Sequence, residues 1–173
     1  MNKVKAFLQL FRSKAEISVF VVFVFLSAIA ANSIKAQSFS EGFDVVLPAG
    51  WTIKNNSSPQ SSVGWHQGDS AVFPAQAGAA NSYAASDSGA TTAGGNISNW
   101  LISPNRTFRN GDVIKFWTRT RTANADADRL QVRFSSAGTS TDVRTTASSV
   151  GVFTTLLLDV NPTLGSNYPT VLD

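Results

Sequence analysis

The chain contains no cysteine among its 173 residues. Disulfide bonds, thiolate catalysis and cysteine-ligated zinc sites are therefore excluded. His66 is the only histidine and no Gly-x-Ser-x-Gly motif is present, so the residues do not suggest a Ser-His-Asp catalytic system. Glycoside hydrolysis needs two carboxylates across the bond, and no spacing pairs Glu41 with a particular aspartate. We therefore expect a non-catalytic protein rather than an enzyme.

Neither sign of charge dominates once the N-terminal segment is set aside. The whole chain has 14 Lys and Arg against 11 Asp and Glu, a formal net charge of +3. Residues 1–36 hold five of those basic residues and one of the acidic ones, which leaves nine basic and ten acidic residues, a net charge of −1. Nucleic-acid binding needs a clustered basic surface on the folded domain. We therefore expect no nucleic-acid partner.

The N-terminal segment has the layout of a secretory signal peptide. Basic residues precede a nearly apolar run at 17–31, and small residues follow it up to Ala36. An uncleaved membrane anchor is the alternative, but a spanning helix needs roughly 20 apolar residues and this run is shorter. We expect a signal-peptide helix over residues 1–36 with cleavage after Ala36, or after Ala30 as second choice. Residues 37–173 would then form one secreted or cell-surface domain.

The rest of the chain shows no helical apolar period. Short β-branched or aromatic segments are separated by clusters of Gly, Pro, Asn and Ser, which is typical of an all-β sandwich or barrel. The expected strands are residues 38–44, 51–54, 63–67, 82–86, 99–103, 112–122, 129–135 and 153–160. The Ala-, Gly- and Ser-rich stretch 71–95 is expected to be a long loop with one short strand. It is either a functional loop or a plain surface excursion.

Two expected strands alternate apolar and polar side chains. In residues 112–122, Ile114 and Phe116 share one face, and in residues 129–135 the apolar face is formed by every second residue from Leu130. If the two strands form a hairpin, their polar faces combine into a candidate ligand-binding surface. Its residues are Lys115, Trp117, Arg119, Arg121, Gln131 and Arg133. The alternative is that this face packs under the loop 71–95 with its cationic ends reaching solvent.

The expected core draws on the last strand and on two tryptophans. Alternation in residues 153–160 places Leu156, Leu158 and Val160 on one face. Trp51 and Trp100 have apolar neighbours and are expected to be buried.

Carboxylates of this chain are candidate ligands for a structural calcium ion. Calcium takes six to eight oxygen ligands from carboxylates, carbonyls and amides. Asp126 and Asp128 offer oxygens at alternate positions of a turn, and Glu41 and Asp44 lie on the first expected strand. The alternative is a solvated turn whose aspartate bonds its own backbone.

Four short motifs follow one another in a recognisable order. They are Phe-Ser-Glu-Gly-Phe-Asp at 39–44, Leu-Pro-Ala-Gly-Trp at 47–51, Ser-Asn-Trp-Leu-Ile-Ser-Pro at 98–104 and Asn-Gly-Asp-Val-Ile-Lys-Phe-Trp at 110–117. In this order they resemble the choice-of-anchor J domain, a relative of cleaved adhesin and MAM-like modules. The resemblance covers residue 38 to about residue 169. It implies an antiparallel jelly-roll β-sandwich on exported bacterial proteins, without shared catalytic residues.

The family continues with further strands beyond the point where this sequence stops. We therefore expect the last strands of the sandwich to be missing, together with any C-terminal anchor. Contact with a membrane would then depend on the export signal or on that missing anchor.

The expected function is that of an exported adhesion or carbohydrate-binding module, whose partner is an extracellular glycan or a surface protein. Two alternatives stay open. One is a structural component of an extracellular matrix or biofilm that assembles through protein contacts. The other is an accessory domain of a secreted hydrolase.

Overall fold

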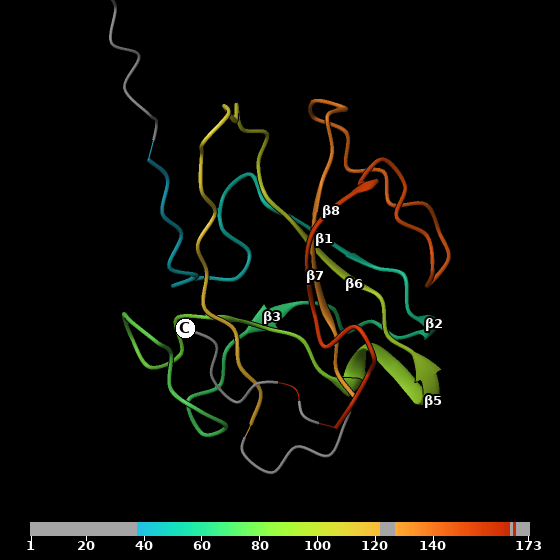
Figure 1. Cartoon of the computed structure of the whole chain (residues 1–173). Helices are drawn as coiled ribbons and strands as arrows, with labels where there is room; N and C mark the ends of the chain where they lie inside the picture. Colours follow the sequence, from blue (N-terminus) through green and yellow to red (C-terminus); the bar gives the residue numbers. More distant parts are fainter. Residues whose placement is uncertain (1–37, 122–126, 167, 169–173) are drawn as a thin grey trace, which may run out of the picture. The chain divides into compact units, whose positions relative to one another are not determined.

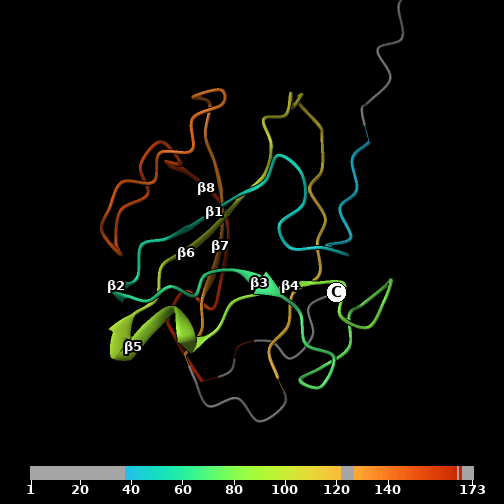
Figure 2. The same cartoon turned by 180° about the vertical axis from the view of Figure 1, so that it is seen from behind.

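A computed structural model of the chain describes residues 38–121, 127–166 and 168 (Figures 1 and 2). The chain divides into two units, residues 1–39 and 40–173, and all the strands described below belong to the second. The predicted signal peptide, residues 1–36, lies outside the described residues. Within the described ranges, no helix has both the length and the apolar character needed to cross a bilayer.

The regular secondary structure described in the second unit consists mainly of short antiparallel strand pairs, which confirms the mostly-β prediction. The pairs are β1 (Thr52–Asn55) with β6 (Asn99–Ile102), β2 (Ser58–Gln60) with β5 (Thr91–Asn96), β3 (His66–Gln67) with β4 (Ala84–Ala85), and β7 (Leu130–Phe134) with β8 (Thr155–Val160). A 3₁₀ turn at Ser88–Ala90 precedes β5, capped by the side chain of Asp87. Figure 1 shows β1 beside β6 and β7 beside β8.

The β1–β6 pair carries two of the motifs found in the sequence. Thr52 of β1 faces Ile102 of β6, and Ile102 is buried. The ring of Trp100 on β6 lies 5.6 Å from the ring of Phe153, which links this pair to the segment that leads into β8. Trp51, just before β1, meets the ring of Phe43 edge-on at 5.0 Å. Both tryptophans are half-buried and packed against aromatic rings.

The buried apolar residues come from distant parts of the sequence. They are Ala90, Ile102, Val143, Val160 and Tyr168. Val143 is the most deeply placed large side chain, at 2% exposure. Many other large apolar side chains of the described residues are exposed to solvent.

Two expected strands are wrong. Residues 38–44 form no strand, because Phe43 adopts a left-handed backbone conformation (φ 54°) that breaks an extended run. Residues 112–121 form none either, apart from an isolated bridge at Thr118. The partner of β7 is β8, and within the described residues this sheet has only these two strands. The hairpin considered for residues 112–122 and 129–135 is therefore not formed there. Ile114 and Phe116, expected to face the core, are exposed.

The loop 71–95 and the last strand also differ from expectation. The loop contains the expected short strand as β4, and in addition a 3₁₀ turn and most of β5. A register shift between Val132 and Arg133 sets Leu156 opposite Arg133, while Leu158 stays opposite Val132. Since directly opposed residues share a face, Leu156 lies on the polar side of the pair. The expected common face of Leu156, Leu158 and Val160 is therefore wrong for Leu156.

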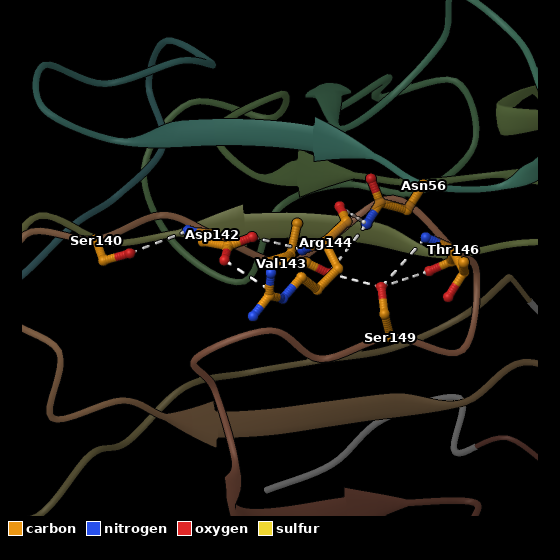
Figure 3. A network of polar contacts seen from close by, with 7 residues as sticks. All are labelled: Asn56, Ser140, Asp142, Val143, Arg144, Thr146 and Ser149. Carbon is orange, nitrogen blue, oxygen red and sulfur yellow. Dashed lines mark hydrogen bonds and ion pairs between the residues drawn. The ribbon is translucent and has the colours of Figure 1, made fainter.

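A polar network fixes part of the long connection between β7 and β8 (Figure 3). The amide of Asn56, which follows β1, donates to the carbonyl of Arg144 at 2.9 Å and reaches that of Val143 at 3.4 Å. The hydroxyl of Ser149 donates to the Val143 carbonyl at 2.7 Å. Arg144 itself has a left-handed backbone (φ 61°), and its N–H donates to Asp142 Oδ1 at 2.8 Å. These bonds hold Val143 in its buried position.

Candidate functional site

Lys115 and Trp117 lie in residues 113–117, a segment without regular secondary structure that begins after a tight turn. In that turn the N–H of Asp112 donates to the carbonyl of Arg109 at 3.0 Å, and Asp112 Oδ2 accepts the N–H of Arg109 at 2.8 Å. Gly111 supplies the positive φ of 97° that the turn needs. Both Lys115 and Trp117 are exposed, Trp117 to 55%. These two side chains are therefore accessible to a ligand.

Thr118 marks the other end of this segment. Its hydroxyl lies 2.8 Å from the phenol oxygen of Tyr168, a buried residue. Burial raises the pKa of the Tyr168 phenol, although the hydrogen bond with Thr118 acts in the opposite direction. The chain thus re-enters the packed part of the domain at Thr118.

Arg119 contacts the loop 71–95, so its guanidinium is not fully open to a ligand. Its guanidinium carbon lies 4.5 Å from the centroid of the Phe73 ring, a cation–π contact. Phe73 stacks on Tyr83 at 4.9 Å, and the Tyr83 hydroxyl donates to the carbonyl of Asp69 at 2.7 Å. Arg119 is half-buried in this arrangement, whereas Arg121 is exposed.

Gln131 and Arg133 belong to a row of polar side chains across β7 and β8. Arg129 Nε donates to Asp159 Oδ1 at 2.8 Å, and a second bond joins Arg129 Nη2 to Asp159 Oδ2. Gln131 Nε2 donates to Asp159 Oδ2 at 3.0 Å, and Gln131 Oε1 accepts from Arg133 Nε at 2.8 Å. Arg133 also reaches the carbonyl of Phe153 at 3.3 Å. Each side chain of this row has at least one partner inside the protein.

Asp159 is the central residue of the row and is not among the candidate residues predicted from the sequence. Hydrogen bonding from Arg129 lowers the pKa of the Asp159 carboxyl; desolvation opposes this and the bond from Gln131 adds to it. The same pairing raises the pKa of Arg129. One signal in the sequence was available. Asp159 is the single charged residue in a mainly apolar strand, and such a residue is favoured by a cation nearby.

The candidate calcium ligands do not converge in the described residues. Glu41 Oε1 accepts the N–H of Phe43 at 2.8 Å, and Asp44 Oδ1 accepts the hydroxyl of the buried Ser82 at 2.5 Å. Asp128 is exposed, and Asp126 lies outside the described residues. Within the described ranges, no group of three or more His, Cys, Asp or Glu side chains is placed to hold a metal ion. Calcium binding therefore stays a prediction from the sequence.

Asp44 instead helps to close a loop. Gln67 on β3 donates to the carbonyls of Phe43 and Asn81 at 3.0 and 2.6 Å, and its side-chain oxygen accepts the N–H of Val46 at 2.8 Å. Together with the Asp44–Ser82 bond, these contacts tie the segment after residue 42 to the loop before β4. Glu41 and Asp44, two of the four carboxylates predicted to bind metal, therefore have structural partners.

The histidine also has a structural setting. His66 Nδ1 lies 3.0 Å from the carbonyl of Gly64, and Nε2 lies 3.6 Å from Asp87 Oδ2. Asp87 uses its other oxygen to cap the 3₁₀ turn through the N–H of Gly89 at 2.7 Å.

The comparisons with known proteins give no match: no family model, no curated protein and no solved structure is similar to this chain at a significant level.

Proposed function

We propose that the chain is an exported, non-catalytic module of the choice-of-anchor J type, with a jelly-roll β-sandwich fold, that binds an extracellular glycan. The observation that carries this proposal is Trp117, a large aromatic side chain 55% exposed beside the exposed Lys115. An indole ring offers an apolar face and one N–H donor. That combination suits a sugar ring, which has apolar C–H faces and hydroxyl groups.

Three of the other predicted residues have partners inside the protein. Arg119 contacts Phe73, and Gln131 and Arg133 bond within the β7–β8 row, so these side chains shape and stiffen the domain. Lys115 remains the exposed cation nearest to Trp117 in the sequence. A cation beside an aromatic ring favours polysaccharides that carry carboxylate groups over neutral ones.

The proposal is tested by binding of the chain to an array of neutral and acidic polysaccharides. We expect saturable binding that Trp117→Ala weakens by about tenfold or more, because truncating a central aromatic contact costs roughly 2 kcal/mol. Val72→Ala is a matched control, since Val72 is an equally exposed apolar residue (54%) on another segment. If Trp117→Ala binds as the wild type does, or the wild type binds no polysaccharide, the glycan proposal is wrong.

Export is proposed on the signal-peptide pattern of residues 1–36. Expression with a bacterial secretion system should yield a mature chain that begins at Gln37, as measured by the mass of its N-terminal peptide. A chain that stays in the cytoplasm at full length would contradict the proposal.

A second function is favoured by one specific observation. The segment 113–117 leaves apolar side chains exposed on both of its faces. A structural component that assembles through contacts between protein chains would use such a segment. Concentration-dependent association without glycan binding, measured by sedimentation velocity, would select this second function.

A further inference from the structure

Asn110 and Gly111 form the only Asn-Gly pair in the sequence. They are the two central residues of the turn before residue 113, in which the N–H of Asp112 donates to the carbonyl of Arg109 at 3.0 Å. Both residues are exposed. Asparagine is a chemically labile residue, and a following glycine has no side chain to shield the carboxamide from the next backbone nitrogen. The turn therefore places together the groups for a covalent change that needs no enzyme.

The hydrogen bonds of this turn leave the reacting groups free. One bond joins the N–H of Asp112 to the carbonyl of Arg109, and the other joins the N–H of Arg109 to Asp112 Oδ2 at 2.8 Å. Within the described residues, no hydrogen bond is made by the Asn110 carboxamide or by the peptide group between Asn110 and Gly111. That peptide group can therefore rotate while the two ends of the turn stay bonded.

The space around Gly111 is open. Its φ is 97°, a conformation that glycine leaves and enters at little cost. Apart from its chain neighbours, no atom of the protein lies within 4 Å of the position that a Cβ on Gly111 would take. The rest of the domain therefore does not block the approach of the Gly111 nitrogen to the Asn110 side chain.

The other described asparagines lack this combination. Several have a carboxamide that is held by hydrogen bonds, namely Asn55, Asn56, Asn99 and Asn161. The remaining ones precede a residue whose side chain crowds the attacking nitrogen, and they are Asn81, Asn96 and Asn105. Asn110 is thus the described asparagine with both a free carboxamide and an unhindered neighbour.

We infer that Asn110 is a site of spontaneous deamidation. The backbone nitrogen of Gly111 gives up its proton to water or hydroxide and forms a bond to Cγ of Asn110. The Cγ–Nδ2 bond breaks, and ammonia leaves after taking up a proton, so that a cyclic succinimide remains. Water then opens this ring at either carbonyl carbon. Residue 110 becomes aspartate or isoaspartate, and the balance is one water consumed and one ammonia released, without any oxidant or reductant.

Both products change the turn. Each adds a negative charge next to Asp112, whose carboxylate already accepts the N–H of Arg109. Isoaspartate also lengthens the main chain by a carbon atom between the two residues that the turn bond joins. The modified turn leads directly into the segment that holds Lys115 and Trp117. The inference itself does not depend on the proposed glycan binding.

The test is a time course of the whole chain in mildly alkaline buffer, followed by tryptic digestion and peptide mass mapping. Cleavage after Arg106 and Arg109 puts Asn105 and Asn110 in different peptides, so Asn105 is an internal control. We expect the peptide that begins at Asn110 to gain the mass that replaces an amino group by a hydroxyl group. It should appear in two chromatographic forms, aspartyl and isoaspartyl, before the Asn105 peptide changes.

Two further comparisons test the part played by the neighbour and by the fold. Gly111→Val should slow the loss of ammonia by about tenfold or more, because a β-branched side chain crowds the nitrogen and disfavours positive φ. The wild type should react at rates within about threefold of each other when folded and in urea, because an exposed, unbonded site needs no opening.

The inference is overturned by any of three results. Asn105 may react as fast as Asn110, Gly111→Val may react as fast as the wild type, or folding may protect Asn110 by about tenfold or more. The rate in urea does not depend on whether a variant folds. Since no readout involves a polysaccharide, failure here leaves the glycan proposal standing.

Discussion

The side chains of Arg129 and Asp159 form a two-point contact across the β7–β8 sheet, with Arg129 Nε 2.8 Å from Asp159 Oδ1. Gln131, directly opposite Asp159 in the ladder, adds a third bond to the same carboxylate. The contact fixes the alignment of two strands that are joined by a long connection. It also makes the stability of the domain sensitive to pH.

We expect the free energy of unfolding to fall in acid partly through Asp159. Its pKa is lowered in the folded protein, so its stabilising contribution is present above the ordinary aspartate pKa of about 3.9 and is lost as the pH falls through the lower folded value. Asp159→Asn should therefore be less stable than the wild type at pH 7, and the difference should shrink at pH 2. Urea unfolding at the two pH values measures this.

Two arginine variants separate this contact from general charge effects. Arg129→Ala removes the main cause of the lowered pKa and should flatten the pH dependence. Arg109 is an exposed arginine in the turn before residue 113, and Arg109→Ala should leave the pH dependence close to that of the wild type. If the wild type, Arg129→Ala and Arg109→Ala show the same dependence of unfolding free energy on pH, the Arg129–Asp159 contact does not contribute to it.

Asn56→Ala should destabilise the domain by about 1–2 kcal/mol, because the carbonyl groups of Val143 and Arg144 lose their amide donor beside a buried side chain. Chemical denaturation gives the difference. Asn105→Ala, at an exposed asparagine, is the control and should change stability by less than about 0.5 kcal/mol. Similar losses in the two variants would contradict the network seen in Figure 3.

Gly151→Ala should be more harmful than Gly138→Ala. Both glycines have positive φ, 53° and 62°, so an added methyl group strains both backbones to a similar degree. At Gly151 a Cβ would also lie 2.0 Å from the carbonyl oxygen of Asp142, whereas nothing lies within 4 Å at Gly138. Thermal unfolding should show a loss of about 1–2 kcal/mol for Gly138→Ala and a clearly larger one for Gly151→Ala. Equal losses would place the backbone of Asp142 elsewhere.

Calcium is expected to raise the midpoint of thermal unfolding if the predicted ion binds, because a ligand that binds only the folded state stabilises it. Asp128→Asn should then reduce the rise, and excess chelator should abolish it. Lys54→Gln, an exposed change on β1, serves as the control. A midpoint that is indifferent to calcium and to chelator would remove the calcium prediction, while a cooperative transition would still show a folded domain.

Local composition predicted strand positions well where the residues of the strand have strong β propensity themselves, whatever strand they pair with. β1 and β6 were predicted to within a residue at each end, because Thr52, Ile53 and Trp100 are strong strand formers. β7 was predicted from its alternation. β5 was missed because its sequence includes Gly94 and Gly95, which have low propensity, and its pairing with β2 comes from a distant part of the chain.

The candidate site was predicted only in part for a related reason. Alternation indicated that Lys115 and Trp117 share a face, and both are exposed. It gave no information on which strand lies alongside, so the exposure of Ile114 and Phe116 was not foreseen. The contact of Arg119 with Phe73, 46 positions away, agrees for this residue with the alternative that the polar face packs under the loop 71–95.

The sequence by itself determined the mostly-β composition of the domain and the lack of thiol chemistry, since these depend on residue type and local periodicity. Only the tertiary structure decided that β7 pairs with β8, that Asp159 is the centre of the polar row and that Ile114 and Phe116 are exposed. A strand's partner is chosen by packing and hydrogen bonding over the whole chain. A short stretch of sequence contains the side chains but not the partner.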